Sequence, residues 1–341
     1  MAAAVSAAIV AWHHDPAIIA QTVDGLLQQS AAPLEVIVVD NTPGTPVADA
    51  LDRGVADLVT VRPGRNVGYA AGCNAAADIA QGDWLFLLNP DARPARDVLE
   101  RLLDAVDADT AVAGAQILLP DGIHVNAGDN PLHVTGISWS GRYGEERECG
   151  PPRDVAVVSG AALLVRSADF EALGGLQPGY FAYHDDVDLA WRARLAGRRV
   201  VFVPGAVVEH DYEFEKGDYK WFLLERNRLW TVLSCYSGAA LALLAPVLAA
   251  TELAVLALAV RQGWWREKLR AWRALWDGRE DLRAWRRRVQ GSRRVGDAAL
   301  LASMTGALDT PLVRLPGAGV INRLLDGWRR AVIALLAAVR R

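Results

Sequence analysis

Trp84-Leu85-Phe86-Leu87-Leu88-Asn89-Pro90-Asp91, residues 84–91, is the stretch that decides the fold. Its apolar run is entered through Gly82-Asp83 and is too short for a buried helix, so it predicts a buried strand that stops at the Asn-Pro-Asp turn. Asp91 is therefore expected at the carboxyl edge of a sheet, where open α/β sheets bind ligands. A carboxylate there can hold a divalent cation against a diphosphate. An exposed turn residue after a core strand would give the same pattern.

The segments before this stretch predict an α/β fold with a mostly parallel sheet. Val5 to Trp12 is a strand candidate, and Asp15-Pro16 opens a segment with helix-start chemistry and helical spacing. The next strand, Leu34 to Val39, ends in Asp40-Asn41, so strand, helix and strand form a βαβ unit. A short strand at 59–61, the loop 66–74 and an Ala-rich helix to Gln81 then lead into the central strand.

The segments after Asp91 continue the alternation up to residue 210. We expect an amphipathic helix at 96–106, strands at 111–119, 155–165, 200–203 and 207–210, and helices at 170–176 and from 184 to 196. Residues 120–154 have no sustained period and are interpreted as a variable loop region near an acceptor. Polar residues recur at strand ends or adjacent turns: Asp40, Asp91, Asp185, Asp186 and His210. Each alone has an ordinary structural explanation, such as a turn, a helix N-terminus or a surface histidine, but together they predict a site.

Short motifs follow one another in a fixed order over about residues 5–230. They are V-S-A-A-I-V-A-W at 5–12, V-I-V-V-D-N at 36–41, N-V-G-Y-A-A-G-C-N at 66–74, L-L-N-P-D at 87–91, S-G-A-A-L-L-V-R at 159–166, H-D-D-V-D-L-A-W-R at 184–192 and E-R-N at 225–227. In their order and spacing the chain resembles the inverting GT-A glycosyltransferases of family 2, particularly the bacterial rhamnosyl- and galactofuranosyl-type branch. The resemblance implies a Rossmann-like GT-A domain at 1–228 with helices flanking the central sheet.

The resemblance implies a nucleotide-sugar donor. Asp40 can accept the imide N–H of uracil or thymine, which favours dTDP- or UDP-sugars because cytosine lacks that proton. The small residues of the 66–74 loop let the backbone approach the nucleotide and its phosphates. Asp91, with His210 at a family metal position, would hold Mg²⁺ or Mn²⁺ and neutralise the departing diphosphate. The implied donor-binding residues are Asp40, Asn41, Arg65, Asn66, Gly68, Asn74, Asn89 and Asp91.

The resemblance also implies the catalytic and acceptor residues. Asp186 is expected to take the proton of the acceptor hydroxyl while that oxygen attacks the anomeric carbon in line, which inverts its configuration. Asp185 stands where the family more often has Glu, and Asn89 stands where other branches have the first Asp of a D-x-D. The second departure leaves a single carboxylate at the metal. Asp185, Asp188, Arg226 and Asn227 are expected to support the acceptor side, with Asp188 capping or orienting the helix after it.

Charge and composition differ between the two ends of the 341-residue chain. Residues 261–341 hold 18 Lys/Arg and 7 Asp/Glu, together with 6 of the 12 Trp, whereas residues 1–260 hold 18 and 33. A basic, Trp-rich segment is typical of a membrane-surface partner, and no nucleic-acid partner is expected. The 3 Cys have no paired spacing, which suits a reducing compartment and predicts neither disulfides nor a zinc site. The apolar N-terminus is interpreted as a strand and not as a signal peptide.

Residues 229–341 are predicted to be a membrane-associated helical region. Residues 238–260 are almost unbroken Ala, Leu and Val, nominally enough for one bilayer span. A single span would place the basic tail across the membrane, against the positive-inside tendency, so a helical hairpin or re-entrant insertion is favoured. Trp265, Leu269, Trp272 and Trp276 share one face of a helix suited to the headgroup layer, and 320–341 repeats the pattern. The alternative is a buried helix packed on the catalytic domain.

The sequence thus predicts a membrane-associated inverting transferase. It would move a rhamnose-like or other hexose from a dTDP- or UDP-sugar to a lipid-linked saccharide or cell-surface glycan precursor. We expect it at the cytoplasmic face of the cell membrane, peripheral or monotopic through residues 229–341. Two other functions stay open. A polyprenyl-phosphate sugar synthase would not need Asp186, because a phosphate acceptor needs no deprotonation, and a nucleotide-sugar-binding scaffold would bind donor without turnover.

Overall fold

The computed structural model describes residues 3–44, 58–210, 217–309 and 318–338, which form two compact units. The sheet unit comprises, among the described residues, 3–130, 140–193 and 198–210. The helical unit comprises 131–139, 194–197 and the described residues from 217 onward. The domain boundary predicted between residues 228 and 229 falls inside helix α6 (Tyr219–Cys235) of the helical unit.

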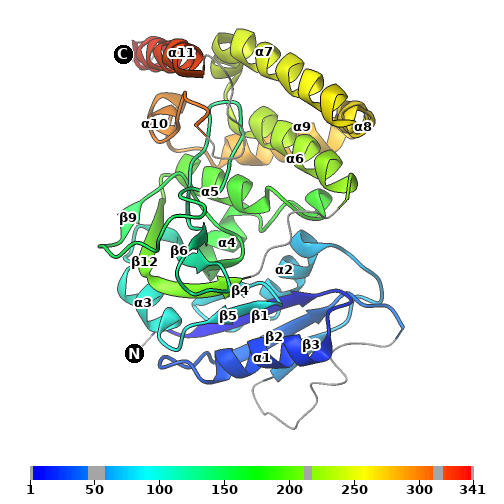
Figure 1. Ribbon diagram of the computed structural model, residues 1–341, viewed down its shortest axis with the longest axis vertical. Helices are drawn as coiled ribbons and strands as arrows, with labels where there is room; N and C mark the ends of the chain where they lie inside the picture. The colour runs from blue at the N-terminus through cyan, green and yellow to red at the C-terminus, as the bar shows by residue number, and fades with distance from the viewer. Residues whose placement is uncertain (1–2, 45–57, 211–216, 310–317, 339–341) are drawn as a thin grey trace. The chain divides into compact units, whose positions relative to one another are not determined.

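The sheet unit is built on one mixed sheet with the strand order β3-β2-β1-β4-β11-β6-β12-β5 (Figure 1). Strands β3, β2, β1 and β4 are parallel, β12 is parallel to β6, and β11 and β5 pair antiparallel to their neighbours. The strands are β1 (Val5–Ala11), β2 (Glu35–Asp40), β3 (Leu58–Val61), β4 (Trp84–Leu88), β5 (Ala92–Pro94), β6 (Thr110–Leu118), β7 (Val125–Ala127), β8 (Asp129–Asn130), β9 (Arg153–Asp154), β10 (Val157–Val158), β11 (Ala162–Arg166) and β12 (Arg199–His210).

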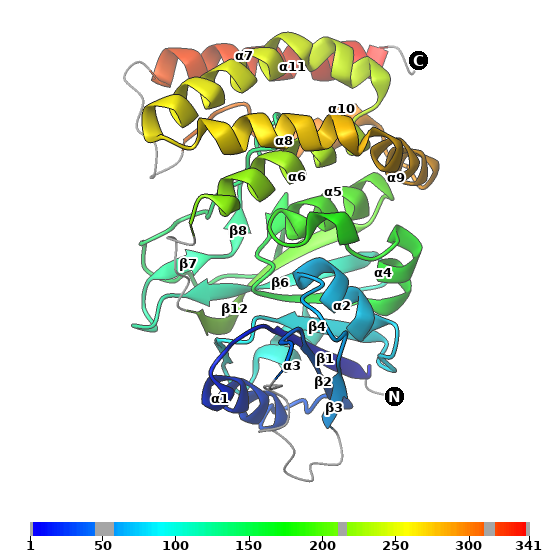
Figure 2. The ribbon, with the colours of Figure 1, turned by 90° about the vertical axis from the view of Figure 1, so that its right-hand side faces the viewer.

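Helices cover both faces of this sheet because its central strands are buried on both sides. Figure 2 shows α1 and α3 on one face and α2, α4 and α5 on the other. Ile19 and Val23 of α1 and Leu99 of α3 join one apolar cluster with Phe86 of β4. The helices are α1 (Pro16–Leu27), α2 (Tyr69–Ala77), α3 (Val98–Asp104), α4 (Ser167–Leu173) and α5 (Asp185–Leu195), with a 3₁₀ turn at Pro178–Tyr180.

The predicted central strand is confirmed, and three neighbouring predictions need correction. β4 is buried along its length and ends just before Asn89. The strand predicted at 155–165 is two strands, β10 and β11, separated by a turn at Gly160. The strands predicted at 200–203 and 207–210 are one strand, β12, with a register shift between Val203 and Val207. Helix α3 is shorter than predicted.

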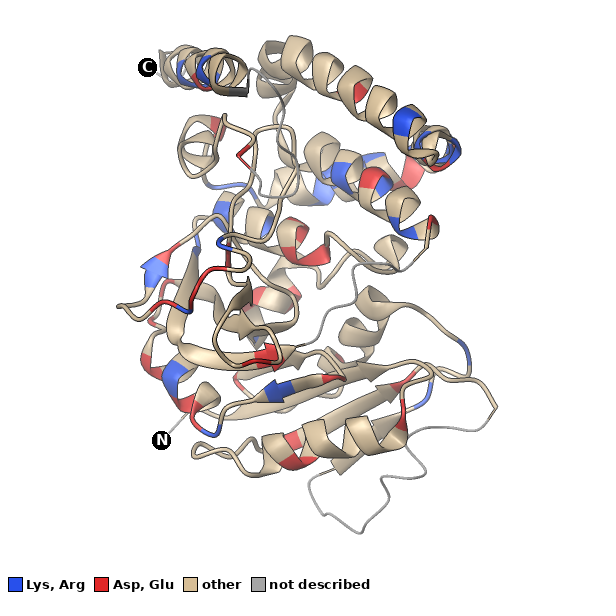
Figure 3. Cartoon of the chain, viewed as in Figure 1, with Lys and Arg blue, Asp and Glu red and all other residues tan. Residues whose placement is uncertain are grey.

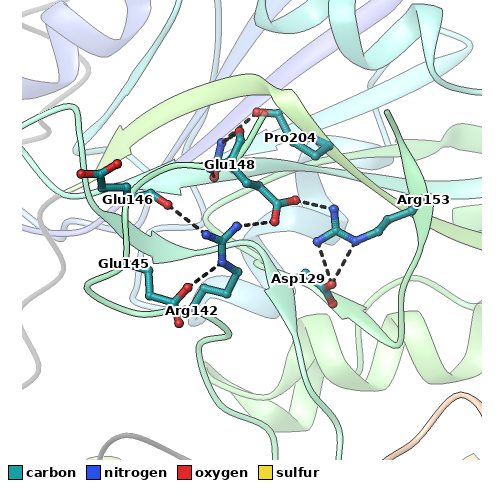
Figure 4. A network of polar contacts seen from close by, with 8 residues as sticks. Asp129, Arg142, Glu145, Glu146, Glu148, Arg153 and Pro204 are labelled. Atoms are coloured by element: carbon teal, nitrogen blue, oxygen red, sulfur yellow. Dashed lines mark hydrogen bonds and ion pairs between the residues drawn. The ribbon is translucent and has the colours of Figure 1, made fainter. Parts of the chain in front are cut away.

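Residues 120–154, which were predicted to be a loop, contain β7, β8 and β9 and an ion-pair network (Figure 4). Glu148 pairs with both Arg142 and Arg153, Arg142 Nε lies 2.9 Å from Glu145 Oε2, and Arg153 Nη2 lies 3.0 Å from Asp129 Oδ2. Single surface ion pairs stabilise little, but a network shares each ordered side chain among several partners. The charged residues of this segment therefore form an ordered network of ion pairs, which hydrophobic periodicity cannot predict.

The helical unit contains α6, α7 (Gly238–Gln262), α8 (Trp265–Asp277), α9 (Arg279–Gly291), α10 (Asp297–Ala302) and α11 (Ala318–Ala338). Helix α7 runs unbroken through Pro246, so residues 238–260 do not form the hairpin that the sequence favoured. Residues 339–341, at the end of the last predicted helix, lie outside the described residues. The segment 131–139 joins this unit through Tyr236, whose hydroxyl donates to the Val134 carbonyl at 2.8 Å.

Candidate functional site

The turn that carries Asp91 joins β4 to β5 and meets the end of β12. β5 pairs with β12 so that Ala92 lies opposite His210. His210 Nε2 thereby lies 3.0 Å from Asp91 Oδ1 and 3.3 Å from Asn89 Nδ2. The His210 side chain is 4% exposed and that of Asp91 31%. Three residues predicted for the donor and metal thus meet at one point of the sheet edge.

Two residues that the sequence analysis did not single out act on this turn. Thr22 of α1 is buried, and its hydroxyl lies 2.8 Å from the Pro90 carbonyl and 3.1 Å from the Ala92 carbonyl, so it fixes the backbone on both sides of Asp91. Burial works to raise the pKa of Asp91, but the hydrogen bond and charge of His210 and the charge of His14 lower it overall. The lowered pKa of Asp91 keeps its carboxylate ionised, as the ligand of a cation must be.

Asp186 lies in the first turn of α5 and is held by backbone groups. Its Oδ2 accepts the N–H of Gly160 at 2.9 Å, and its Oδ1 accepts the N–H of Val187 at 2.8 Å. Burial raises the pKa of Asp186 in spite of these two hydrogen bonds. The Gly160 turn leads into β11, whose antiparallel pairing places Ala162 opposite Leu88 at the end of β4.

The two turns are directly joined. The backbone N–H of Asn89 donates to the Ala161 carbonyl at 2.9 Å. Asp186 is hydrogen-bonded to Gly160, and Ala161, the next residue, is hydrogen-bonded to Asn89. Asn89 is two residues from Asp91 in the chain. Asp91, His210 and Asp186 therefore gather at one edge of the sheet, which the sequence predicted from strand ends alone.

Asp185 is buried behind Asp186, at 6% exposure, beside Tyr69 and Cys73 of α2. Burial and the charge of Asp186 raise the pKa of Asp185 well above its usual range. Burial and the charge of Asp185 in turn raise the pKa of the Cys73 thiol. The Tyr69 hydroxyl donates to the Gly160 carbonyl at 3.0 Å. These buried surroundings therefore favour the neutral forms of Asp185 and Cys73, and the Tyr69 hydrogen bond steadies the turn that holds Asp186.

The backbone before Asp185 is strained. Phe181, Tyr183 and His184 have φ values of 66°, 69° and 67°, which non-glycine residues seldom adopt. The Phe181 carbonyl accepts the N–H of Tyr69 at 2.6 Å, and a Cβ on Gly68 would lie 2.5 Å from the same oxygen. Gly68 was predicted to let the backbone approach the nucleotide. In the structure its missing Cβ admits the Phe181 loop.

The remaining predicted donor residues divide between strand ends and supporting contacts. Asp40, at the end of β2, accepts the Thr42 N–H at 3.0 Å. Asn41 donates to the Gly68 carbonyl at 3.1 Å, and its buried Oδ1 accepts no hydrogen bond from the described residues. Asn66 accepts the Gly68 N–H at 2.9 Å, and Arg65 is exposed.

Asn74 and Asp188 are engaged in structural contacts. Both amide atoms of Asn74 bond to the backbone of Leu176 at 2.8 Å. Asp188, which is fully buried, lies 2.7 Å from Arg192 Nε, as expected of a residue that orients the helix. Arg226 and Asn227 lie on α6 in the helical unit, where Arg226 Nε donates to Asn227 Oδ1 at 3.0 Å.

A metal would find two protein ligands at this edge. Among the described residues, no group of three or more His, Cys, Asp or Glu side chains could hold a metal ion. Asp91 offers a carboxylate oxygen and His210 a ring nitrogen 3.0 Å from it, which suits Mg²⁺ or Mn²⁺ ions that take most of their ligands from substrate phosphates and water. A closed structural metal site, with four protein ligands, does not fit these residues.

Residues 6–174 match the family model described as glycosyl transferase family 2. They are therefore a family 2 glycosyltransferase domain, and the predicted family and enzyme class are confirmed. The chain is 32% identical over 206 residues to the N-acetylglucosaminyl-diphospho-decaprenol L-rhamnosyltransferase of Mycobacterium tuberculosis, covering 52% of this chain and 66% of that protein. It is 30% identical over 189 residues to the pre-mycofactocin glycosyltransferase of the same species, covering 54% of this chain and 39% of that protein.

Solved glycosyltransferases share the fold. GalNAc-T7, crystallised with UDP, GalNAc and Mn²⁺, superposes with a TM-score of 0.57 at 14% identity over 69% of this chain and 48% of that one. The mannosyltransferase PcManGT of Pyrobaculum calidifontis, in complex with GDP-Man and Mn²⁺, gives 0.50 at 18% identity over 99% of this chain and 87% of that one. The predicted GT-A fold is confirmed.

Proposed function

We propose that the protein is an inverting glycosyltransferase that moves a sugar from a dTDP- or UDP-linked donor to a hydroxyl of a lipid-linked saccharide or glycan precursor. The observation that supports this most is the hydrogen-bonded connection between two turns, one carrying Asp91 and one holding Asp186. A transferase needs to hold the leaving group and the acceptor proton on either side of one anomeric carbon. Two carboxylates fixed on adjoining turns meet that requirement.

The donor side consists of the ends of β2, β4 and β12. Asp40 would read the pyrimidine, whose imide N–H it can accept. Asp91 and His210 would hold Mg²⁺ or Mn²⁺, and that ion would supply positive charge to the departing nucleoside diphosphate. Two relatives of the fold were crystallised with nucleotide or nucleotide sugar and Mn²⁺, which supports this choice. Thr22 would keep Asp91 in place by fixing the turn.

The acceptor side consists of Asp186 and its supports. Asp186 would accept the proton of the attacking hydroxyl, so that the hydroxyl oxygen displaces the diphosphate from the opposite face of the sugar. Its raised pKa makes it a stronger base than an exposed aspartate, and the Gly160 and Val187 N–H groups fix its direction. Asp185, the buried neighbour of Asp186 in the chain, would support it.

The acceptor class is inferred from a relative and from the helical unit. The name of the rhamnosyltransferase relative gives a lipid diphosphate sugar as its acceptor. Helix α7 has the length and apolar composition of a membrane segment. Together they support a lipid-linked acceptor at the cytoplasmic face of the cell membrane, where nucleotide sugars are available to the enzyme.

A donor screen tests the proposal. Membranes containing the full chain and extracted lipid are supplied with dTDP- and UDP-sugars, and release of the nucleoside diphosphate is measured with and without EDTA. We expect release from one donor class that depends on lipid and on metal. Donor binding without release from any of them would identify a nucleotide-sugar-binding scaffold instead. Release in which Asp186→Asn is as active as the unchanged chain would identify a phosphate-acceptor synthase.

A further inference from the structure

Helix α7 is long and apolar enough to span a membrane, but it carries a carboxylate that is ion-paired to neighbouring helices. Its most apolar window has a mean hydropathy of 2.2 and is 11% buried in the structure. At about 1.5 Å per residue, 25 residues would cross the hydrocarbon of a bilayer. Length and composition therefore leave two arrangements open, in which α7 crosses the membrane or lies along it.

Glu252 decides between these arrangements. It lies in the second half of α7, and its Oε2 accepts from Lys268 Nζ at 2.7 Å and from Trp272 Nε1 at 2.6 Å. Its Oε1 pairs with Arg228 of α6. Lys268 and Arg228 are 0% and 3% exposed, and both also pair with Glu225. Separating α7 from α6 and α8 would leave buried charges without their counterions, so α7 stays on the helical unit.

The face of α7 that turns away from its buried residues Leu244 and Val247 is exposed and apolar. Pro246, Leu253 and Val260 recur at seven-residue intervals, which places them on one side of the helix. Leu253 is 67% exposed and Val260 60%. Glu252 and Arg261 are the charged residues of α7, and Arg261 lies at its C-terminal end (Figure 3). A long apolar face that is exposed to water marks an interaction site for a protein or a membrane.

Helix α11 extends this face. The Trp328 indole donates to the Leu243 carbonyl of α7 at 3.1 Å, so the two helices lie side by side (Figure 2). Arg329 fixes the inner side of α11 by donating to the Leu301 carbonyl at 3.1 Å. The outer side exposes Leu324 at 70%, Trp328 at 43% and Leu335 at 53%. Helical spacing places Arg323 and Arg330 together along one edge of that stripe.

We propose that α7 and α11 lie in the plane of an anionic membrane surface and that α7 does not cross it. The docking face consists of Pro246, Leu253, Val260, Leu324, Trp328 and Leu335. Arg261, Arg323 and Arg330 at its margins complement the negative charge of lipid headgroups. This inference rests on the proposed function for its lipid-linked acceptor and adds the face and the mode of contact.

Vesicle binding by the full chain tests the face. The vesicles are equal parts phosphatidylcholine and phosphatidylglycerol, with pure phosphatidylcholine for comparison. We expect the double variant Leu253→Gln/Leu324→Gln to lose binding at least tenfold, and the matched control Leu34→Gln, 50% exposed in the sheet unit, to bind normally. Arg323→Gln/Arg330→Gln should weaken binding only to the anionic vesicles. Both double variants change exposed side chains, and unchanged thermal midpoints confirm that they fold.

Cysteine labelling tests the mode. In a Cys149→Ser background, Ala239→Cys and Arg261→Cys mark the two ends of α7, and a membrane-impermeant maleimide is added to protein bound outside the vesicles. Both ends should react. Protection of one end only would show a span and overturn the proposal, as would undiminished binding of Leu253→Gln/Leu324→Gln. If the unchanged chain instead forms a dimer and binds no vesicles, and Leu253→Gln/Leu324→Gln dissociates that dimer, the docking face binds a second copy of the chain and the proposal is overturned. Leu253→Gln/Leu324→Gln should transfer sugar to a water-soluble acceptor as fast as the unchanged chain does. Absence of this transfer in both the variant and the unchanged chain would count against the proposed function instead.

Discussion

At the scale of single residues, the two carboxylates of the D-D-V-D segment that differ most in role are Asp186 and Asp188. Asp186 is half-buried and accepts hydrogen bonds from the backbone N–H groups of Gly160 and Val187, with no charged side chain paired to it among the described residues, so its carboxylate can still take a proton. Asp188 is fully buried against Arg192. The motif gives them similar sequence surroundings, and the structure separates the proposed base from an aspartate held in a buried ion pair.

We expect Asp186→Asn to keep donor binding and to lose transfer by roughly a hundredfold or more, the scale of a missing general base. Asp188→Asn is the contrasting variant. Breaking its buried pair should cost about 3–5 kcal/mol of unfolding free energy and lower the thermal midpoint. Turnover kinetics and thermal melts distinguish the two, and near-normal transfer by Asp186→Asn would remove it from the mechanism.

Asp91 and His210 should contribute unequally to metal-dependent donor binding. Asp91→Ala removes a charged oxygen ligand, which Mg²⁺ and Mn²⁺ prefer, whereas His210→Ala removes a ligand that adds coordination without charge. Calorimetric titration of the donor with and without metal measures both. We expect the larger loss for Asp91→Ala. Activity that survives EDTA unchanged would show that neither residue holds a metal.

Asp185 should make the free protein less stable as the pH rises. Its pKa is raised in the folded state, so between its unfolded and folded pKa values the unfolded chain ionises and the folded chain does not. Stability is therefore lost as pH rises through this window, and the loss is complete above the folded pKa. Asp185→Asn should remove it. The thermal midpoint of the variant should exceed that of the unchanged chain by more at pH 8 than at pH 4, and a constant difference would contradict the assignment.

At the scale of elements, the turn between β10 and β11 links the proposed base to the turn of the proposed metal ligand Asp91. Gly160 donates to Asp186, its own carbonyl accepts from Tyr69, and the next carbonyl accepts from Asn89. Sequence alone showed a glycine interrupting a strand pattern. It could not show these bonds, because their partners lie far away in the chain.

Gly160→Ala should disturb Asp186 without harming donor binding. A Cβ at this position would lie 3.1 Å from Asp186 Cβ, so the carboxylate must shift by a few tenths of an ångström. We expect kcat to fall about tenfold, with the donor KM unchanged, because small displacements of catalytic groups are costly. Gly150→Ala, which meets nothing within 4 Å, is the matched control. Equal kinetics for the two variants would show that the turn does not position the base.

At the scale of the whole molecule, sequence predicted the features that depend on local pattern. The buried 84–88 strand, the βαβ opening and the strand-end positions of Asp40, Asp91 and His210 follow from periodicity and turn residues. The placement of Asp91, His210 and Asp186 at one edge of the sheet could be expected from the parallel topology. Thr22 and His14 escaped notice because a buried threonine and a loop histidine have no pattern of their own.

The helical unit was harder to predict because its order depends on long-range pairs. In the sequence Glu252 stands alone within the apolar run 238–260, and its partner Lys268 lies among the Arg residues of the next segment. Only folding brings these charges together and shows which face of α7 turns inward. In the same way, segment 131–139 has no sequence signal that assigns it to the helical unit.

The central claim is inversion at the anomeric carbon by a base on one side and a held diphosphate on the other. The most direct test is the anomeric configuration of the transferred sugar, determined by NMR on product made by the full chain from its preferred donor. We predict a configuration opposite to that of the donor. Retention of the donor's configuration would contradict a single displacement assisted by Asp186.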